Sequence, residues 1–460
     1  MPVIKARLGS VIPLLSYANP GRAAPEAAAG RPGSIRRPAG RCSSFVRPVP
    51  MVQSPFPLLS AHLPPAPRDY RAKEVMARRV LLILPDLRNP QFKGGIQVFN
   101  NYLVSALRRL GFELRIISVN DRAQDASPEV PELIPCNRGR HARKAIAAAQ
   151  LFRQAIAFRP EFMLCGHLNF TPVCAAASRL LKIPFITITH GVELWNPPAN
   201  LLRTLAVGAR IISVSRYTRG LVLEKLPGFP PERAVVFQNT FDPDVFVPRE
   251  KSPELMSELG LSRDDKVILT ICRLAQSEQL KGYDKVIRVL PEVLRAVPEA
   301  RYVLGGRGDD VPRIEGLIRE LGLEGRVIMP GFVSADRLVD FFNLADVFVM
   351  PSKKEGFGIV FLEAMSCGKP VIAGNKDGSM DAVQDGKLGI AIDPDDPLAL
   401  REAIITVLTG KGEARLYDPR RIRRDVIEAF GFEGFVRRLG EILADITAPR
   451  HSSAAKAGRA

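Results

Sequence analysis

Residues 346–365 read Asp-Val-Phe-Val-Met-Pro-Ser-Lys-Lys-Glu-Gly-Phe-Gly-Ile-Val-Phe-Leu-Glu-Ala-Met. The apolar run before Pro351 predicts a buried parallel strand, and the pattern after Gly358 predicts a helix. Between strand and helix lies a loop where backbone N–H groups can receive an anionic ligand. Two carboxylates, Glu355 and Glu363, bracket this loop and suit hydroxyl groups better than phosphates. A ligand with both phosphates and hydroxyls, such as a nucleotide sugar, is therefore our first hypothesis.

This two-glutamate segment, followed by Cys-Gly-Lys-Pro-Val-Ile-Ala-Gly at 367–374, strongly resembles the retaining nucleotide-sugar glycosyltransferases of family 4. Similar positions extend over roughly residues 80–439. The resemblance implies an α/β protein of the GT-B fold, with two Rossmann-like doubly wound domains facing a cleft. It also implies that Glu363 holds the ribose and Glu355 the donor sugar. The donor-binding residues that it implies in the loop between them are Gly356, Phe357, Gly358, Ile359 and Val360.

The composition fits a globular protein of two domains, since 460 residues exceed one ordinary core. The formal net charge is +17, and residues 1–75 hold 11 of the 65 Lys and Arg but only 3 of the 48 acids. The excess in the remainder is modest, and no Arg/aromatic pattern indicates nucleic acid binding. An anionic small molecule or a membrane surface explains the basic balance better.

The cysteines and histidines carry no metal-binding pattern. Six cysteines are spread along the chain without a Cys-x-x-Cys pair, which indicates buried thiols in a reducing compartment. Five dispersed histidines predict no metal site, and no cofactor is expected. No apolar run approaches the ~20 residues of a membrane span. We therefore expect a cytoplasmic protein, or a peripheral one on the inner face of the plasma membrane.

Residues 1–75 contain 13 of the 39 prolines and no sustained periodicity, so we expect them to be a disordered basic extension. Their composition imitates a transit peptide, but Met76 lies just before the first expected strand. An overcalled start or a dispensable tail is the interpretation we favour.

The N-terminal Rossmann-like acceptor domain is expected at 76–245. It begins with a strand at 80–84, a helix at 98–110 and a second strand at 114–119, a β-α-β start. The glycine pair Gly94-Gly95 before the helix lets a backbone approach a ligand without interference from Cβ atoms. In the resembled family, a glycine pair here lies against the donor phosphates and the acceptor.

Residues 138–159 carry six basic residues and no acid, in a predicted helix with apolar positions that include Leu151, Ile156 and Phe158. One interpretation is an ordinary packing helix with a solvated basic face. The other is an amphipathic surface that docks on anionic lipid, where a lipid-linked acceptor would reside.

His190 ends the apolar strand predicted at 184–189 and is followed by Gly191. The carboxyl ends of strands in open α/β sheets are where ligands bind. With the family resemblance, we expect the imidazole of His190 to hydrogen-bond a sugar hydroxyl near the reacting carbon.

The C-terminal Rossmann-like nucleotide-sugar domain is expected at 246–425, with its first strand at 266–272. Arg273 and Lys281 follow that strand, where the resembled enzymes hold the donor diphosphate. A planar arginine and a lysine point charge can together clamp a pyrophosphate. Phe332 and Val333 end a later strand, where the resemblance implies backbone hydrogen bonding to the base.

Three further features of this half bear on its ligand. The glycine-rich segment 302–309 lacks the Gly-x-Gly-x-x-Gly spacing, so NAD is disfavoured. The loop 375–379, Asn-Lys-Asp-Gly-Ser, departs from the commoner small-residue run of the family. Beyond it we expect C-terminal helices at 426–448 that pack back on the first domain, and a tail at 449–460.

Together with these patterns, the family resemblance implies a hexosyltransferase-type, retaining, metal-independent enzyme. It would move a sugar from a nucleotide diphosphate sugar to a glycan or lipid-linked acceptor, in cell-surface polysaccharide or glycolipid synthesis. His190, Arg273, Lys281 and Glu355 are the expected catalytic residues. The two Asp-x-Asp sequences, 242–244 and 393–395, fall outside the loops assigned to the site. A GT-B-fold epimerase and a non-catalytic nucleotide-sugar-binding protein remain the alternatives.

Overall fold

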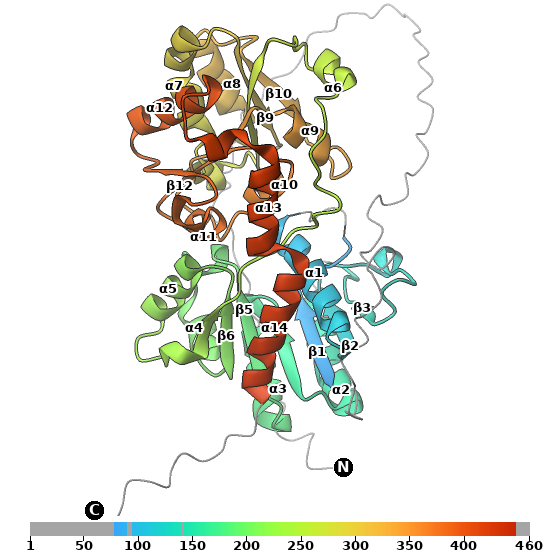
Figure 1. Cartoon of the computed structure of the whole chain (residues 1–460). Helices are drawn as coiled ribbons and strands as arrows, with labels where there is room; N and C mark the ends of the chain where they lie inside the picture. Colours follow the sequence, from blue (N-terminus) through green and yellow to red (C-terminus); the bar gives the residue numbers. More distant parts are fainter. Residues whose placement is uncertain (1–77, 90–93, 140–141, 448–460) are drawn as a thin grey trace, which may run out of the picture. The chain divides into compact units, whose positions relative to one another are not determined.

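A computed structural model describes residues 78–89, 94–139 and 142–447, and all of these residues belong to one compact unit. The expectations for 1–75 and 449–460 lie outside the described residues. Two parallel sheets with helices make up the described chain, so the expected α/β architecture with two doubly wound sheets is confirmed (Figure 1).

The first sheet has the strand order β3-β2-β1-β4-β5-β6-β7. Its strands are β1 (Arg79–Leu84), β2 (Glu113–Ser118), β3 (Leu133–Pro135), β4 (Phe162–Cys165), β5 (Phe185–Thr189), β6 (Arg210–Ser213) and β7 (Ala234–Val236). Its helices are α1 (Gly95–Arg109), α2 (Arg143–Phe158), α3 (Thr171–Leu181), α4 (Ala199–Leu205) and α5 (Arg216–Lys225), with one-turn segments η3 (Ala123–Asp125), η4 (Leu168–Phe170), η5 (Val192–Leu194) and η6 (Pro231–Arg233).

The second sheet has the order β10-β9-β8-β11-β12-β13. Its strands are β8 (Lys266–Ile271), β9 (Ala300–Gly305), β10 (Val327–Gly331), β11 (Val347–Met350), β12 (Val371–Gly374) and β13 (Ile390–Ile392). The helices and turns of this half are α6 (Pro253–Glu258), η7 (Gln276–Lys281), α7 (Tyr283–Ala296), α8 (Val311–Glu320), α9 (Leu338–Leu344), α10 (Ile359–Ser366), α11 (Ser379–Ala382), η8 (Gln384–Gly386), α12 (Pro397–Leu408) and η9 (Ala414–Tyr417), followed by α13 (Pro419–Phe430) and α14 (Phe432–Thr447).

Both sheets reverse their strand order once, between β1 and β4 in the first and between β8 and β11 in the second. The strands at these points are almost wholly buried, because helices cover both faces of a doubly wound sheet. Loops that leave the carboxyl ends of two such neighbouring strands diverge, and ligands bind in the crevice this creates. The fold therefore offers one binding position on each sheet.

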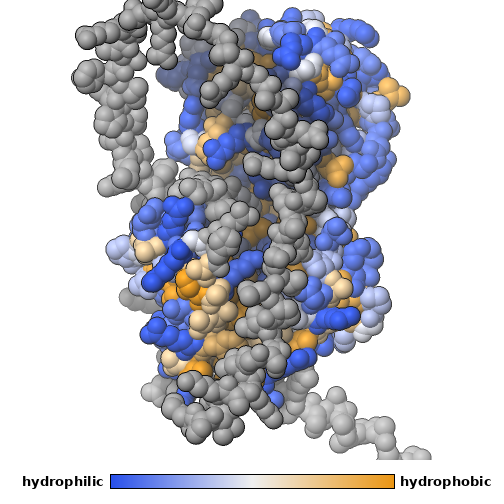
Figure 2. All heavy atoms as spheres, turned by 180° about the vertical axis from the view of Figure 1, so that it is seen from behind, coloured by the Kyte–Doolittle hydropathy of each residue, from blue (hydrophilic) through white to orange (hydrophobic). Residues whose placement is uncertain are grey.

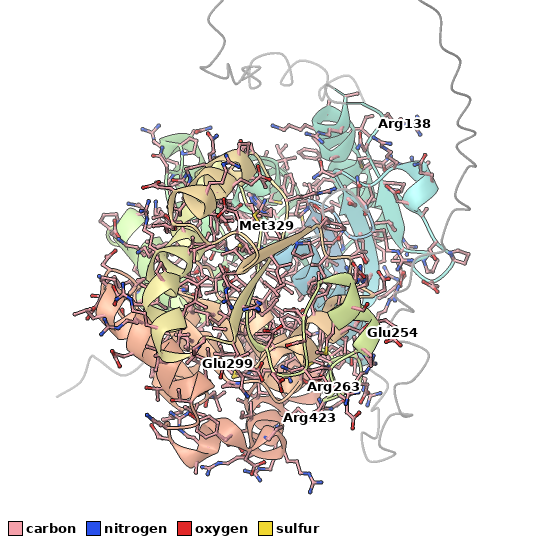
Figure 3. The ribbon with its side chains drawn as sticks, turned by 90° about the horizontal axis from the view of Figure 1, so that it is seen from above. Arg138, Glu254, Arg263, Glu299, Met329 and Arg423 are labelled. Carbon is pink, nitrogen blue, oxygen red and sulfur yellow. The ribbon has the colours of Figure 1, made fainter. Side chains whose placement is uncertain are left out.

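The last two helices contact elements of both halves. The ring of Phe435 in α14 lies 6.1 Å from that of Phe99 in α1, and Figure 1 shows the two helices side by side. The ring of Phe430 in α13 lies 5.7 Å from that of Phe357, just before α10. Arg423 of α13, labelled in Figure 3, donates to the carbonyl oxygens of Pro243 (2.7 Å) and Phe246 (2.5 Å) in the segment that joins the two sheets.

The basic helix expected at 138–159 begins at Arg143, five residues later than expected. Leu151 and Phe158 are buried, as an ordinary packing helix requires, but the side chain of Ile156 is 61% exposed. Among the described residues, no helix combines the length and the apolarity that a membrane span requires.

Candidate active site

The second sheet brings Lys281 and Glu355 together at its reversal point. Lys281 ends η7, which follows β8, and Glu355 lies in the loop that follows β11. The two segments touch through the backbone, since the Lys353 amide donates to the Leu280 carbonyl at 2.8 Å. The Lys281 ammonium forms a hydrogen-bonded ion pair with the Glu355 carboxylate, and each side chain is 17% exposed. Burial lowers the pKa of Lys281, but the charge of Glu355 outweighs it, so the net shift is upward and the lysine stays charged.

Arg273 lies in the same connection between β8 and α7 as Lys281, but its side chain points outward. Its side chain is 72% exposed and pairs with Glu278 at 2.5 Å. Burial raises the pKa of the half-buried Cys272 thiol to about 12, and the charges of Lys281, Glu278, Glu355 and Arg273 also act on it. Arg273 and Lys281 thus share one neighbourhood, although no direct contact joins them.

Asp377 supports the loop that carries Glu355. The carboxylate of this buried residue accepts hydrogen bonds from the Ser352 hydroxyl (2.7 Å), the Glu355 amide (2.7 Å) and the Ser379 amide (2.9 Å). Burial raises its pKa to about 6, despite those hydrogen bonds. Gly378 packs so closely that a Cβ there would lie 2.1 Å from the Gly356 carbonyl oxygen. The unusual loop 375–379 is therefore a support for the Glu355 loop.

Replacing Asp377 with alanine should loosen this loop. The Ser352 hydroxyl and two amides would lose their acceptor, at about 1–3 kcal/mol for each buried group left unsatisfied. We expect a lower melting temperature and faster amide hydrogen exchange over residues 352–358. Asp377→Asn keeps one acceptor oxygen and should have a smaller effect. Unchanged exchange in the alanine variant would show that Asp377 does not hold the loop.

The N-terminus of α10 faces the same loop. Gly358, just before the helix, has a φ of +92°, a conformation that favours glycine. Within the described chain, no carbonyl accepts a hydrogen bond from the amides of residues 357–360. Amides without a carbonyl partner at the N-terminus of a helix suit an anion.

Glu363 lies in the second turn of α10 and is 6% exposed. Burial raises its pKa from 4.5 to about 8. The folded protein therefore binds a proton more tightly than the unfolded chain between these values. It follows that this residue lowers the stability of the folded state as the pH rises from about 5 to about 8.

Glu363→Gln removes this burial of charge and should stabilise the protein at alkaline pH. The difference in unfolding free energy between variant and wild type should grow by about 1.4 kcal/mol per pH unit across that window and then level off. Chemical denaturation of both proteins at several pH values measures it. A difference that does not change with pH would contradict the assignment.

His190 follows β5 in the first sheet and is 7% exposed. Its Nε2 lies 3.1 Å from the Gly166 carbonyl oxygen, which can only accept, so Nε2 carries the proton and Nδ1 has a lone pair. Burial lowers the pKa of His190 and favours this neutral form. The ring packs edge-on against Phe99 of α1, with the centroids 5.2 Å apart.

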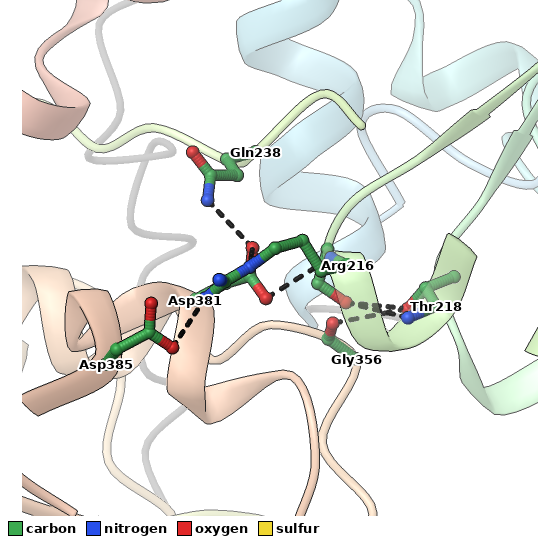
Figure 4. Close-up of polar contacts among 7 residues, drawn as sticks. Arg216, Thr218, Gln238, Gly356, Asp381 and Asp385 are labelled. Carbon is green, nitrogen blue, oxygen red and sulfur yellow. Dashed lines mark hydrogen bonds and ion pairs between the residues drawn. The ribbon is translucent and has the colours of Figure 1, made fainter. Parts of the chain in front are cut away.

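The loops of the two sheets meet at a pair of glycines. Gly191 has a φ of +105°, and a Cβ on it would lie 3.0 Å from the Gly356 Cα. A Cβ on Gly356 would lie 1.9 Å from the His190 carbonyl oxygen. The Thr218 hydroxyl of α5 donates to the Gly356 carbonyl at 3.3 Å (Figure 4). The expected site residues His190, Glu355 and Gly356 therefore belong to one neighbourhood.

Arg216 adds a polar contact that the sequence did not reveal. Its guanidinium pairs with Asp381 at 3.2 Å and with Asp385 at 2.7 Å, and Figure 4 shows it between the two carboxylates. The side-chain amide of Gln238 donates to the same Asp381 at 2.8 Å. Nearby, the Lys354 ammonium lies 5.3 Å from the centre of the Trp195 ring.

The other residues expected in the site lie at its edge. Gly94 caps α1 and Gly95 begins it, and Cβ atoms on either would meet none of the described residues within 4 Å. Protein packing therefore does not require these glycines. Phe332 is 51% exposed with the Arg307 guanidinium 4.5 Å from its ring centre, while Val333 is buried.

The two Asp-x-Asp sequences lie where the sequence predicted, 242–244 between the two sheets and 393–395 directly after β13. The loop of Asp393 and Asp395 nevertheless contacts the Glu355 loop, because Asp395 pairs with Lys353 at 2.8 Å and with Lys376 at 3.0 Å. These lysines hold the pKa of Asp395 far below its usual value. Across the part of the chain that the structure describes, no three His, Cys, Asp or Glu residues are grouped to hold a metal ion.

Comparison with known proteins finds a glycosyltransferase family model that matches each half of the chain. The model of the glycosyltransferase family 4 matches residues 93–245, and that of the glycosyl transferases group 1 matches residues 251–423. An uncharacterized glycosyltransferase of Methanocaldococcus jannaschii is 25% identical over 370 residues, 76% of this chain and 93% of that protein.

A GDP-mannose-dependent α-(1-6)-phosphatidylinositol monomannoside mannosyltransferase of Mycolicibacterium smegmatis is 33% identical over 249 residues. That match covers 51% of this chain and 62% of the mannosyltransferase, less than two thirds of its length. Among solved structures, Anabaena Alr3699/HepE in complex with UDP and glucose superposes with a TM-score of 0.63 at 21% identity, covering 80% of this chain and 100% of that one.

Proposed function

This chain belongs to the family 4 glycosyltransferases of GT-B fold, and we propose that it transfers a sugar, with retention, from a nucleotide diphosphate sugar to an acceptor hydroxyl. The observation that carries the proposal is the ion pair of Lys281 and Glu355 in the loop after β11, which leads into the N-terminus of α10. It offers a cation and a helix N-terminus to a diphosphate, and carboxylates to hydroxyl groups. The mannosyltransferase relative, named for GDP-mannose, uses a donor of this class.

In this proposal the protein stabilises the leaving diphosphate by charge. Lys281 and Arg273, helped by the amides from Gly356 to Val360, would neutralise the negative charge that develops as the sugar bond breaks. Such preorganised stabilisation is usually the largest catalytic contribution. These groups would make a metal ion unnecessary, and the proposed reaction needs no cofactor.

The remaining residues would orient the donor. Glu363 would accept hydrogen bonds from the ribose, and Glu355 would hold the donor sugar. The backbone at Phe332 and Val333 would contact the base. His190, with its Nδ1 lone pair, would accept a hydrogen bond from a sugar hydroxyl near the reacting carbon. No covalent nucleophile is assigned, so the leaving phosphate would take the acceptor proton.

A screen of nucleotide sugars for thermal stabilisation tests the donor class, because a bound ligand raises apparent stability by mass action. We expect one nucleotide family to stabilise the protein, and Glu363→Gln to weaken that effect. If no nucleotide or nucleotide sugar shifted the melting curve, the proposal would fail. Incubation with donor alone separates the epimerase alternative, since net isomerisation of the sugar would contradict transfer.

A glycolipid or cell-surface polysaccharide acceptor is our proposal for the second substrate. The mannosyltransferase relative is named for a phosphatidylinositol acceptor, which is a lipid. In this chain, Ile156 of α2 and Leu180 of α3 are 61% and 69% exposed, and Lys144 and Arg153 of α2 are exposed as well. Figure 2 shows hydrophobic side chains gathered on the half of the molecule that contains the first sheet.

The same basic surface includes two exposed arginines at its ends, Arg138, which Figure 3 labels, and Arg159. Apolar side chains among cations suit the interface of an anionic membrane, where each added cation contributes about 1 kcal/mol. On this proposal the enzyme works in the cytoplasm, against the inner face of the plasma membrane.

Flotation with phosphatidylglycerol vesicles tests the membrane contact. Wild type should float with these vesicles at low salt, less at high salt, and not with phosphatidylcholine alone, because the attraction is screened. The double variant Ile156→Asp/Leu180→Asp should stay at the bottom of the gradient. Leu398→Asp, which changes a leucine of α12 that is 59% exposed, is the matched control and should float normally. Wild type that never floats would remove this part of the proposal.

A further inference from the structure

Asp310 is a fully buried carboxylate that directly follows the glycine-rich segment 302–309, and the proposed function does not use it. Its Oδ2 accepts a hydrogen bond from the Tyr283 hydroxyl at 2.6 Å, and its Oδ1 accepts one from the Gln279 side-chain amide at 2.9 Å. Gln279 lies two residues before Lys281, and Tyr283 lies two residues after it. One carboxylate therefore holds the chain on both sides of the lysine assigned to the donor diphosphate.

Arg313 keeps this carboxylate ionised. Its guanidinium donates to both oxygens of Asp310, at 2.8 Å and 2.6 Å. Burial opposes the charge of Asp310, but the hydrogen bonds from Arg313, Tyr283 and Gln279 outweigh burial, so its pKa lies below the usual value. An ionised acceptor makes shorter and stronger hydrogen bonds than a neutral one. The two hydrogen bonds beside Lys281 are therefore strong at neutral pH.

Two glycines of the glycine-rich segment pack against the other end of the connection between β8 and α7. A Cβ on Gly306 would lie 2.0 Å from the Cys272 carbonyl oxygen, and one on Gly308 would lie 2.0 Å from the Leu274 carbonyl oxygen. These carbonyls belong to the residues on either side of Arg273. The segment and the aspartate after it therefore support the connection at both proposed cations.

We propose that Asp310 is a positioning residue of the donor site, which acts through the residues on either side of Lys281 to hold its ammonium against the leaving diphosphate. This inference rests on the proposed function, because it concerns the same reaction. It also gives the glycine-rich segment, which lacks the spacing of a dinucleotide loop, a role in sugar transfer. A displacement of about 1 Å in a positioning element can cost about 100-fold in rate, so loss of one of these hydrogen bonds is measurable in kcat.

Two variants each remove one of the hydrogen bonds beside Lys281 and leave the pair of Asp310 and Arg313 in place. They are Tyr283→Phe, which deletes only the hydroxyl, and Gln279→Ala. We expect each to lower the kcat of nucleotide release about tenfold and to change the KM of the acceptor less than about twofold, because the acceptor does not contact this turn.

Tyr302→Phe is the matched control for Tyr283→Phe. Tyr302 of β9 is also fully buried, and its hydroxyl donates to Thr270 of β8 at 2.9 Å, inside the sheet rather than beside Lys281. This variant should lose a similar amount of stability and keep the wild-type kcat. If Tyr302→Phe lowers kcat as much as Tyr283→Phe, the effect is one of stability and the proposal is overturned.

A double-mutant cycle determines whether the effect passes through Lys281. In the Lys281→Ala protein, Tyr283→Phe and Gln279→Ala should each cost less than about twofold more, because no ammonium remains to be positioned. Losses that multiply independently would contradict the proposal.

Binding of GDP and UDP, measured by titration calorimetry, tests the same support without turnover and without the less stable Lys281→Ala protein. Tyr283→Phe and Gln279→Ala should bind the diphosphate that wild type prefers about tenfold more weakly, since the charge-assisted contact with Lys281 is displaced. Tyr302→Phe should bind it as wild type does. Equal binding by all four proteins would overturn the proposal. If the diphosphate binds as expected but no sugar is transferred, the proposed function fails and the positioning role of Asp310 stands.

Discussion

Replacing Lys281 with alanine is expected to slow sugar transfer by about 100-fold or more, the loss seen when one group that stabilises developing charge is removed. Lys281 is a largely buried cation at the reversal point of the second sheet, and its pKa is raised, so it stays charged at neutral pH. As the bond between the sugar and the diphosphate breaks, one further negative charge would develop on the leaving diphosphate, against that ammonium. The rate of nucleotide release at saturating donor and acceptor measures the effect.

Stability complicates this variant, because alanine leaves the Glu355 carboxylate largely buried without its cation. Breaking a buried pair from one side costs about 3–5 kcal/mol. Lys281→Arg is the matched control, since it keeps the charge and should keep the fold. The arginine variant should melt near wild type and transfer sugar faster than the alanine variant. A folded Lys281→Ala protein with the wild-type rate would disprove the catalytic assignment.

The second large effect is expected from Gly356→Ala. A Cβ at this position would lie 1.9 Å from the His190 carbonyl oxygen, far inside van der Waals contact, so the Glu355 loop must shift by an ångström or more. Misplacement of about 1 Å in a positioning element can cost about 100-fold in rate. We expect that loss in kcat, with weaker donor binding, measured by nucleotide release and by thermal shift with the donor.

Gly220→Ala is the control variant for Gly356→Ala. It lies in α5, where a Cβ would meet nothing within 4 Å, so Gly220→Ala should raise stability by about 0.5–1 kcal/mol through helix propensity. Its activity should be unchanged. If Gly356→Ala behaved like Gly220→Ala, the close approach of the two loops would have no role in transfer.

Local pattern predicts much of this fold. The strand, loop and helix over 346–365 follow from an apolar run, a proline and a glycine pair, all of which act over a few residues. The edge strands β3 and β7 were missed, because three residues are too few to show a pattern. The first helix begins at Gly95 rather than 98, since the glycine pair that suggested a loop also serves as its cap.

The contacts within the site were harder to predict. Lys281 and Glu355 are 74 positions apart, and Arg216 and Asp381 are 165 apart. Strand order decides which strand ends become neighbours, and periodicity does not report strand order. Asp377 had a local signal, since its side chain accepts from the amide two residues later as turn-forming aspartates do.

The contacts of Arg216 also bear on how tightly the donor is held. They tie α5 of the first sheet to the short helices after β12, beside the loop that carries Glu355. A loop anchored from two sides spends a larger fraction of its time in the arrangement that binds. The apparent dissociation constant equals the intrinsic constant divided by that fraction. Affinity for the nucleotide sugar is thus a joint property of both sheets, although Lys281, Glu355 and Glu363 all belong to the second.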